Sequence, residues 1–154
     1  MSYGHNNRNS NRNSNRNSNA HNKDNVSFKL TDDDINNILN INSGNIGTVI
    51  ELSNKFSKEI KLIPSSKLRM FYDYAIDIDE NIRENWYVRI SLLKPKMAYH
   101  LSKESDTYVK SALKTLETNF SKIIDNINND KDKFKDFKTF FESLVAYHKI
   151  YSNK

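Results

Sequence analysis

Side chains that commonly carry catalysis or hold metal ions are few in this sequence, and they are not grouped. The chain has no cysteine, so it has no disulfide, no thiolate metal site and no cysteine nucleophile. Of its four histidines, His5 and His21 lie near the N-terminus, whereas His100 and His148 are far apart. No His-Glu-x-x-His or Glu-x-x-His motif and no glycine-rich phosphate loop is present. We therefore expect no catalytic residue, no metal site and no cofactor; a Ser-His-Asp triad stays open, but no spacing indicates one.

Two acidic groups have spacings that could bind a metal ion. Asp73, Asp77 and Glu80 would share one face of a helix, and residues 32–34 are three consecutive aspartates. These aspartates follow Thr31, and a hydroxyl followed by acidic residues is typical of a helix N-terminus, where the helix dipole favours negative charge. We interpret them as a helix start. We interpret the other three as an acidic face toward solvent or a partner, rather than as ligands of a helical-bundle metalloenzyme.

The basic residues are the more informative charged group. Between positions 89 and 103 there are four of them and no acidic residue: Arg89, Lys94, Lys96 and Lys103. Three of the four lie seven residues apart and would nearly eclipse one another on an uninterrupted helix, although Pro95 disturbs that register. Lys67 and Arg69 stand at another predicted helix start, where backbone N–H groups favour anions. These residues could follow a nucleic-acid backbone, but on residue type alone an ordinary solvated face is the preferred interpretation.

Helices would have to position these side chains, because apolar residues recur every three or four positions along most of the chain. No segment has the clear alternation of a strand. Pro64 should end one helix and Ser65 or Ser66 should cap the next, whereas Pro95 should kink or break a longer helix after about Lys94. The sequence therefore predicts an all-α bundle of five to six helices, at about 31–42, 45–61, 65–82, 81–101, 106–128 and 134–151.

The last predicted helix has the clearest apolar stripe, with steps of three and four from Phe134 to Tyr151. Phe140 and Val145 widen the stripe, which predicts two neighbouring helices. We expect the aromatic residues on this stripe to form the core rather than a platform for stacking bases. Three tyrosines lie beside the stripes, and their role stays open: Tyr72, Tyr99 and Tyr147.

Charge and composition divide the chain into a leader and a folded body. The 154 residues carry a net charge of +5; residues 1–25, with four basic residues and one acidic residue, hold +3, which leaves +2 for the rest. The unit RNSN occurs three times in residues 8–19 without an apolar residue, so we expect a disordered leader at 1–25 and a helical domain at 26–154. We expect no signal peptide and no membrane span, and the lack of cysteine fits the cytoplasm.

Three segments change the interpretation of the basic residues. They are SSKLRMFYDYA at 65–75, LLKPKMAYH at 92–100 and FKDFKTFFESLVAYHKIY at 134–151. In this order and at these separations they resemble the small subunit of the type III-A CRISPR effector, the Csm complex. The resemblance extends over about residues 45–151, and the last segment is its most specific part. One departure follows Ala-Tyr, where many relatives have a small residue, glycine and arginine but this chain has His-Leu-Ser-Lys at 100–103.

The resemblance implies a small, non-catalytic helical protein, copies of which stack along a ribonucleoprotein that acts in antiviral defence. Such subunits lie beside larger guide-RNA-binding subunits and line the channel that holds crRNA paired with target RNA. They touch RNA without reading its bases, and other subunits carry out the cleavage and signalling chemistry. The alternative is a helical protein–protein interaction bundle that binds a partner through its acidic face and has no direct RNA role.

The expected RNA contacts are basic residues placed either in the three similar segments or in the basic stretch around Pro95. At position 103 a lysine would replace the arginine of the relatives. The expected contacts are Lys67, Arg69, Lys94, Lys96, Arg89, Lys103 and Lys149.

Overall fold

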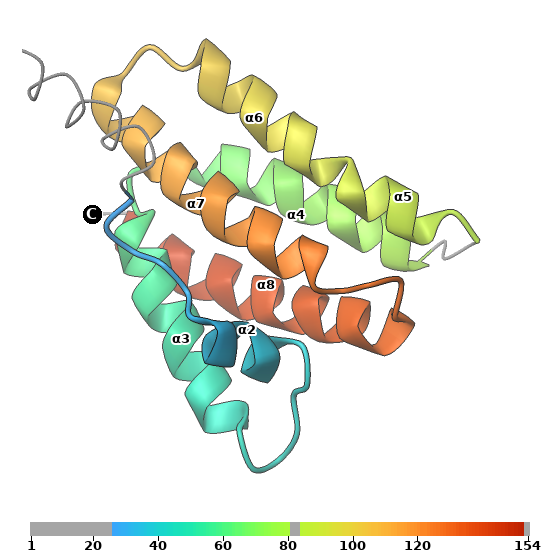
Figure 1. The fold of residues 1–154 in the computed structure, drawn as a ribbon. Coiled ribbons are helices and arrows are strands. Elements are labelled where there is room, and N and C mark those ends of the chain that lie inside the picture. Colours follow the sequence, from blue (N-terminus) through green and yellow to red (C-terminus); the bar gives the residue numbers. More distant parts are fainter. Residues whose placement is uncertain (1–25, 81–83, 153–154) are drawn as a thin grey trace, which may run out of the picture.

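The structure is a computed structural model that describes residues 26–80 and 84–152, and within this part of the chain the regular elements are all helices. In chain order they are α2 (Asp32–Ile38), α3 (Ile46–Glu59), α4 (Ser65–Glu80), α5 (Trp86–Ser91), α6 (Leu93–Lys103), α7 (Thr107–Asp125) and α8 (Lys131–Ser152). Figure 1 shows them packed as one bundle. The predicted all-α fold is confirmed, whereas the leader expected at residues 1–25 lies outside the described residues.

Local hydrogen bonds explain where two of the helices begin. Thr31 Oγ1 accepts a hydrogen bond from the Asp34 backbone N–H at 3.0 Å, and Asp34 Oδ2 accepts one from the Thr31 N–H at 2.9 Å. This reciprocal capping box confirms that the aspartates after Thr31 start a helix. At α4 the expected serine cap is wrong, because the carbonyl of Pro64 accepts the first helical bonds, from Lys67 and Leu68.

The predicted fourth helix is two helices, α5 and α6, separated by Leu92. The expected break after about Lys94 is therefore placed two residues too late. Pro95 is the third residue of α6, and in the first turn of a helix the N–H that proline lacks has no intrahelical partner. The Leu92 N–H still bonds the Val88 carbonyl at 3.1 Å, and the Lys96 N–H bonds the Leu92 carbonyl at 3.3 Å. The backbone thus continues from α5 into α6 with little interruption.

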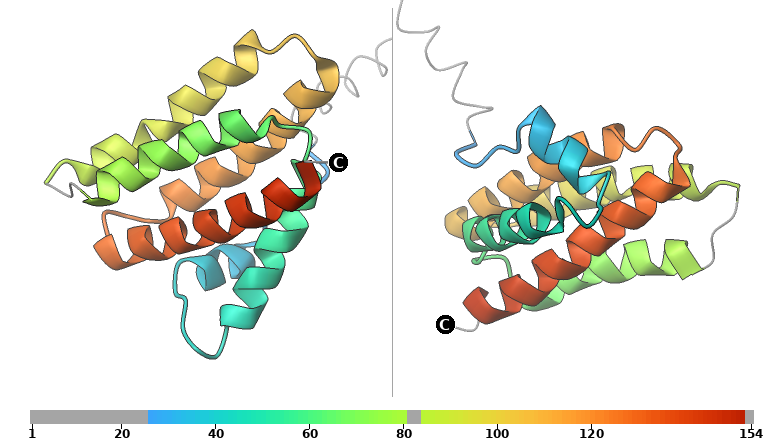
Figure 2. Two further views of the ribbon diagram at one scale, coloured as in Figure 1. Left: turned by 180° about the vertical axis from the view of Figure 1, so that it is seen from behind. Right: turned by 90° about the horizontal axis from the view of Figure 1, so that it is seen from below.

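Aromatic side chains of α8 form the centre of the core, as its apolar stripe predicts. The buried residues of this helix include Phe134, Phe137, Phe140, Phe141 and Leu144. The two neighbours expected from the wide stripe are α3 and α4, which pack against α8 from different sides (Figure 2), while α6 packs against α7. None of the described helices is long and apolar enough to cross a membrane.

One buried polar residue fastens the segment before α2 to the bundle. Asn119 on α7 is fully buried, and its Oδ1 accepts a hydrogen bond from the Leu30 N–H at 2.8 Å. Its Nδ2 donates to the carbonyls of Phe28 and Thr115, at 3.0 and 2.9 Å. The bonds to Leu30 and Phe28 therefore satisfy backbone groups of the segment before α2, while the bond to Thr115 holds the amide against its own helix.

Candidate nucleic-acid interface

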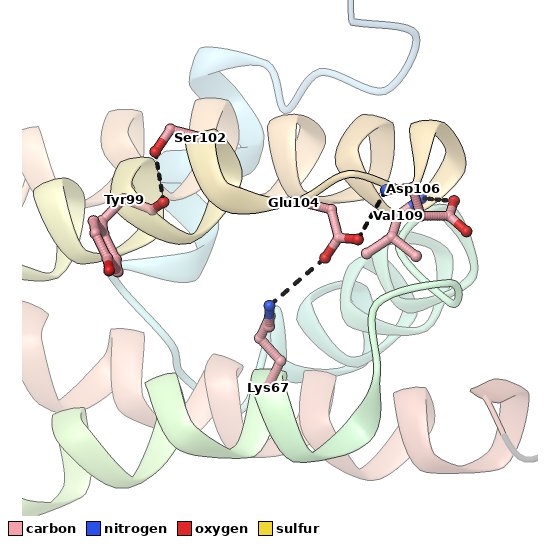
Figure 3. Close-up of polar contacts among 6 residues, drawn as sticks. All are labelled: Lys67, Tyr99, Ser102, Glu104, Asp106 and Val109. Atoms are coloured by element: carbon pink, nitrogen blue, oxygen red, sulfur yellow. Dashed lines mark hydrogen bonds and ion pairs between the residues drawn. The ribbon is translucent and has the colours of Figure 1, made fainter.

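Lys67 projects from the first turn of α4 toward the connection between α6 and α7 (Figure 3). Its Nζ lies 3.7 Å from Oε1 of Glu104, and the exposed fractions of the two side chains are only 24% and 18%. Glu104 Oε2 also accepts a hydrogen bond from the Asp106 N–H at 3.0 Å. Asp106 in turn caps α7 by accepting from the N–H groups of Tyr108 and Val109. Lys67 is therefore held by the same connection that starts α7.

The predicted acidic face is occupied by two arginines. Arg69 Nε lies 3.2 Å from Asp73 Oδ1 one turn along α4, and Arg89 on α5 lies 3.1 Å from Asp77 Oδ2. The side chain of Glu80 lies outside the described residues. Among the residues that the structure describes, no group of three or more histidine or acidic side chains could hold a metal ion. The two aspartates therefore act here as partners of basic residues.

Lys94 and Lys96 lie on opposite sides of α6. Lys94 Nζ binds Asp125 Oδ1 at the end of α7. Lys96 Nζ instead lies 4.7 Å from the ring centroid of Tyr74 on α4, a cation–π distance. The pair expected to act together on RNA is thus divided between two neighbouring helices in the free subunit.

Two basic residues of this stretch, Arg89 and Lys96, contact α4. The carbonyl of Arg89 accepts a hydrogen bond from Tyr74 Oη at 2.7 Å, and Lys96 lies over the same ring. Lys103, two turns further, lies 5.6 Å from the ring centroid of Tyr99. Because α5 continues almost directly into α6, Arg89 and Lys96 keep one register and both reach α4.

An open groove of about 800 Å³ lies between α4 and α6. Its apolar and aromatic lining is interrupted by two aspartates and one lysine: Met70, Phe71, Asp73, Tyr74, Asp77, Leu92, Pro95, Lys96, Tyr99 and His100. Partial burial lowers the pKa of His100, and nearby Lys67 and Lys96 lower it further. Sequence patterns did not identify this groove, because its two walls come from α4 and α6, which are separated in the sequence by the whole of α5.

Arg69 and Lys149 do not line this groove. They lie together with His148 in a second cavity, between the start of α4 and the end of α8. The predicted set therefore does not form one strip. Lys96 lines the α4–α6 groove, and Arg69 and Lys149 line the α4–α8 cavity. Lys94 instead binds Asp125 on α7, and Lys67 pairs with Glu104.

A scan of protein-family models matches residues 44–154 to the family described as Csm2 Type III-A. No curated protein and no solved structure matches the chain. The matched region starts just before α3 and includes every helix from α3 to α8, together with all three segments that resemble the family and all seven predicted contacts. The chain therefore belongs to the Csm2 family of type III-A CRISPR systems, the small subunit of the Csm complex.

Proposed function

We propose that this subunit binds the crRNA and its paired target RNA through phosphate contacts that do not depend on base sequence. It acts as a non-catalytic part of the cytoplasmic effector in antiviral defence, with copies stacked along the complex and other subunits performing the chemistry. Membership of the family supports a place in the complex. The arrangement of basic side chains beside the α4–α6 groove supports contact with RNA.

One observation carries this proposal. Lys96 and Lys103 each lie over a tyrosine ring, and neither has a carboxylate partner among the described residues. A lysine held over an aromatic face keeps its charge and can direct N–H groups at a phosphate oxygen. Tyr99, which is 58% exposed, offers a face for a ribose or a splayed base beside these charges. Such contacts position an RNA backbone without reading its sequence.

The ion-paired residues of the predicted set remain available to RNA because solvent-exposed pairs are weak. Arg69 and Asp73 have exposed fractions of 61% and 63%. Pairs of this kind contribute about 0–1 kcal/mol. A phosphate in the channel can replace the carboxylate at small cost, and counterion release from the RNA favours the exchange. Lys67 is the exception, because its pair with Glu104 is largely shielded from water.

The same ion pairs favour a second candidate, a protein–protein role without RNA contact. Two of the aspartates that hold the arginines line the α4–α6 groove, and Met70, Leu92 and Tyr99 leave apolar surface exposed there. A groove of this kind can receive an apolar side chain of another subunit. In that case the lysines around it would serve solubility.

Photo-crosslinking separates the two candidates. The complex would be assembled with target RNA that carries 4-thiouridine in the paired region, irradiated, and the crosslinked peptides of this subunit mapped by mass spectrometry. We expect crosslinks on the α4-facing edge of α6, reduced by the pair Lys96→Gln and Lys103→Gln. The matched control changes two exposed lysines, Lys131→Gln and Lys135→Gln, and should leave the crosslinks unchanged. An intact complex with no crosslink to this subunit would favour the protein–protein role.

A further inference from the structure

The α4–α6 groove has the size and lining of a site for a small ligand. Four of its ten lining residues carry rings: Phe71, Tyr74, Tyr99 and His100. Its volume of about 800 Å³ lies within the roughly 300–1,000 Å³ that small-molecule sites occupy. Such sites commonly combine apolar and aromatic walls with a few polar groups that orient the ligand. The groove is therefore large enough for a nucleotide, and its walls suit a flat ring.

The ring of Tyr99 offers a face on which a flat ligand can stack. It extends from α6 on the side of α4 (Figure 3) and is 58% exposed. The neighbouring ring of His100 is nearly perpendicular to it, with an interplanar angle of 83°, so the two rings are not stacked on one another. Lys103 lies 5.6 Å from the Tyr99 centroid and adds positive charge beside the ring. Exposed aromatic rings among cations are the surfaces on which unpaired bases stack.

The charge of the groove favours an anionic group. Asp73 is part of the lining, but it binds Arg69 at 3.2 Å. Asp77 likewise binds Arg89 at 3.1 Å. With each of these carboxylates matched by an arginine, Lys96 is the charge that remains in the lining, and it has no carboxylate partner among the described residues. A phosphate that enters the groove therefore meets a positive charge.

The rings and this charge lie close enough to act on one ligand. Lys96 and Tyr99 are three residues apart on α6, a spacing that makes their side chains neighbours on one face of the helix. Burial lowers the pKa of His100, and the charges of Lys67 and Lys96 lower it further, so both lysines raise the electrostatic potential at that ring. Because Lys67 is paired with Glu104, the lysine that can bind an anion there is Lys96.

We propose that the α4–α6 groove binds one nucleotide of the bound RNA, splayed out from its neighbours. Its base would stack on Tyr99, and its phosphate would bind Lys96. Because a base stacked in this way is held by its ring faces, any of the four bases can occupy the site, as binding without sequence readout requires. That the nucleotide belongs to RNA rests on the proposed function, whereas the preference for a base joined to a phosphate follows from the rings and Lys96.

Nucleotide binding is measured on the isolated full-length chain by NMR, with the ring resonances of Tyr99 and His100 as reporters. The probes are AMP, ribose 5-phosphate, which lacks the base, and adenosine, which lacks the phosphate, all titrated at equal ionic strength. Tyr99→Leu is the test variant, because it removes the stacking face at an exposed position and keeps an apolar side chain. Tyr108→Leu changes an exposed tyrosine of α7 that does not line the groove and is the matched control.

We expect AMP to shift both rings saturably, and each of the two fragments to bind at least about tenfold more weakly than AMP. Tyr99→Leu, followed through His100, should weaken AMP binding by about tenfold, whereas Tyr108→Leu should change it little. The proposal fails if AMP moves neither ring, if either fragment binds as tightly as AMP, or if both variants weaken binding equally.

A segment of another subunit is the alternative occupant, and Leu92→Ser tests it, because Leu92 is an exposed apolar residue of the lining. If AMP does not bind and Leu92→Ser prevents assembly of the complex, the groove docks a protein and the nucleotide proposal is wrong. The salt dependence of target-RNA binding by the assembled complex is measured separately. If that binding depends on the predicted lysines while AMP leaves the groove unoccupied, this inference fails and the proposed function stands.

Discussion

Lys94 and Lys96 are two residues apart on α6, yet Lys94 binds Asp125 on α7 while Lys96 lies over Tyr74 on α4. Their charges are therefore presented differently in the free subunit. Lys96 has no carboxylate partner among the described residues, whereas Lys94 would have to leave Asp125 in order to bind a phosphate. The difference allows their contributions to RNA binding to be separated by changing the partner rather than the lysine.

Asp125→Asn should release Lys94 and raise the affinity of the assembled complex for target RNA. The ion pair is partly exposed, so breaking it should cost at most about 1 kcal/mol. Freeing Lys94 from it should therefore raise the affinity for target RNA by no more than about fivefold. Filter binding at low salt measures the change. Asp132→Asn, which removes an exposed acid at the start of α8, is the control for net charge. Equal increases from both variants would show that Lys94 has no particular role.

The ion pair between Lys67 and Glu104 should be stronger than the one between Arg69 and Asp73. The first is largely shielded from water and shares its carboxylate with the start of α7, whereas the second is exposed along one helix. Double-mutant cycles to alanine, read by urea unfolding, should give a coupling of about 0.5–1 kcal/mol for the first pair. For the second we expect about 0.3 kcal/mol, as for i,i+4 pairs. A larger coupling for the exposed pair would contradict this ranking.

Asn119→Ala should destabilise the subunit by about 2–4 kcal/mol, because it leaves the buried Leu30 N–H and the partly buried Phe28 carbonyl without partners. Tm should fall by roughly 2–4 °C for each kcal/mol in a domain of this size. Calorimetry tests this, with Asn126→Ala at the exposed end of α7 as the control. A decrease below about 1 kcal/mol would mean that the segment before α2 contributes little to stability.

Stability should decline on acidification through the titration of His148. Burial lowers the pKa of this ring from its usual 6.5, so on acidification the unfolded chain takes up the proton first. The contribution of a neutral His148 is complete above the unfolded pKa and is lost as the pH falls through it toward the lower folded value. Urea unfolding in phosphate-free buffer should give a smaller free energy of unfolding at about pH 5.5 than at about pH 7.5.

The control for that pH dependence is a second histidine. His148→Gln should remove most of the difference between the two pH values, whereas His100→Gln should remove less. Burial also lowers the pKa of His100, but this ring is only half-buried and its shift owes part to Lys67 and Lys96. An unchanged pH dependence in His148→Gln would assign the effect to other groups.

The helices and the core were predictable because both depend on local periodicity. Steps of three and four from Phe134 onward place one face of α8 in the interior whatever its neighbours are, and the buried phenylalanines follow directly. The break near Pro95 was misplaced because proline is tolerated in a first turn as well as after a helix, and sequence does not distinguish the two.

The partners of the basic residues were not predictable, apart from one. Arg69 and Asp73 are four residues apart on a helix, a spacing that brings side chains together. Lys94 meets Asp125 across 31 positions, and Lys67 meets Glu104 only because α4 and the α6–α7 connection lie side by side. Such pairs depend on tertiary packing, and so do the α4–α6 groove and the α4–α8 cavity.

The most direct test of the proposed function is the salt dependence of target-RNA binding by the assembled complex carrying four alanines, at Lys67, Arg69, Lys94 and Lys96. The variant should assemble, and its affinity should fall by about the same factor for every RNA sequence. The slope of log affinity against log salt should become shallower by roughly 0.7–0.9 for each lysine or arginine that binds a phosphate in the native complex. A control with four exposed lysines changed to alanine, Lys55, Lys110, Lys131 and Lys135, should keep the original slope. Failure to assemble would identify the four residues as protein contacts, and assembly with unchanged affinity and slope would contradict their role in binding RNA.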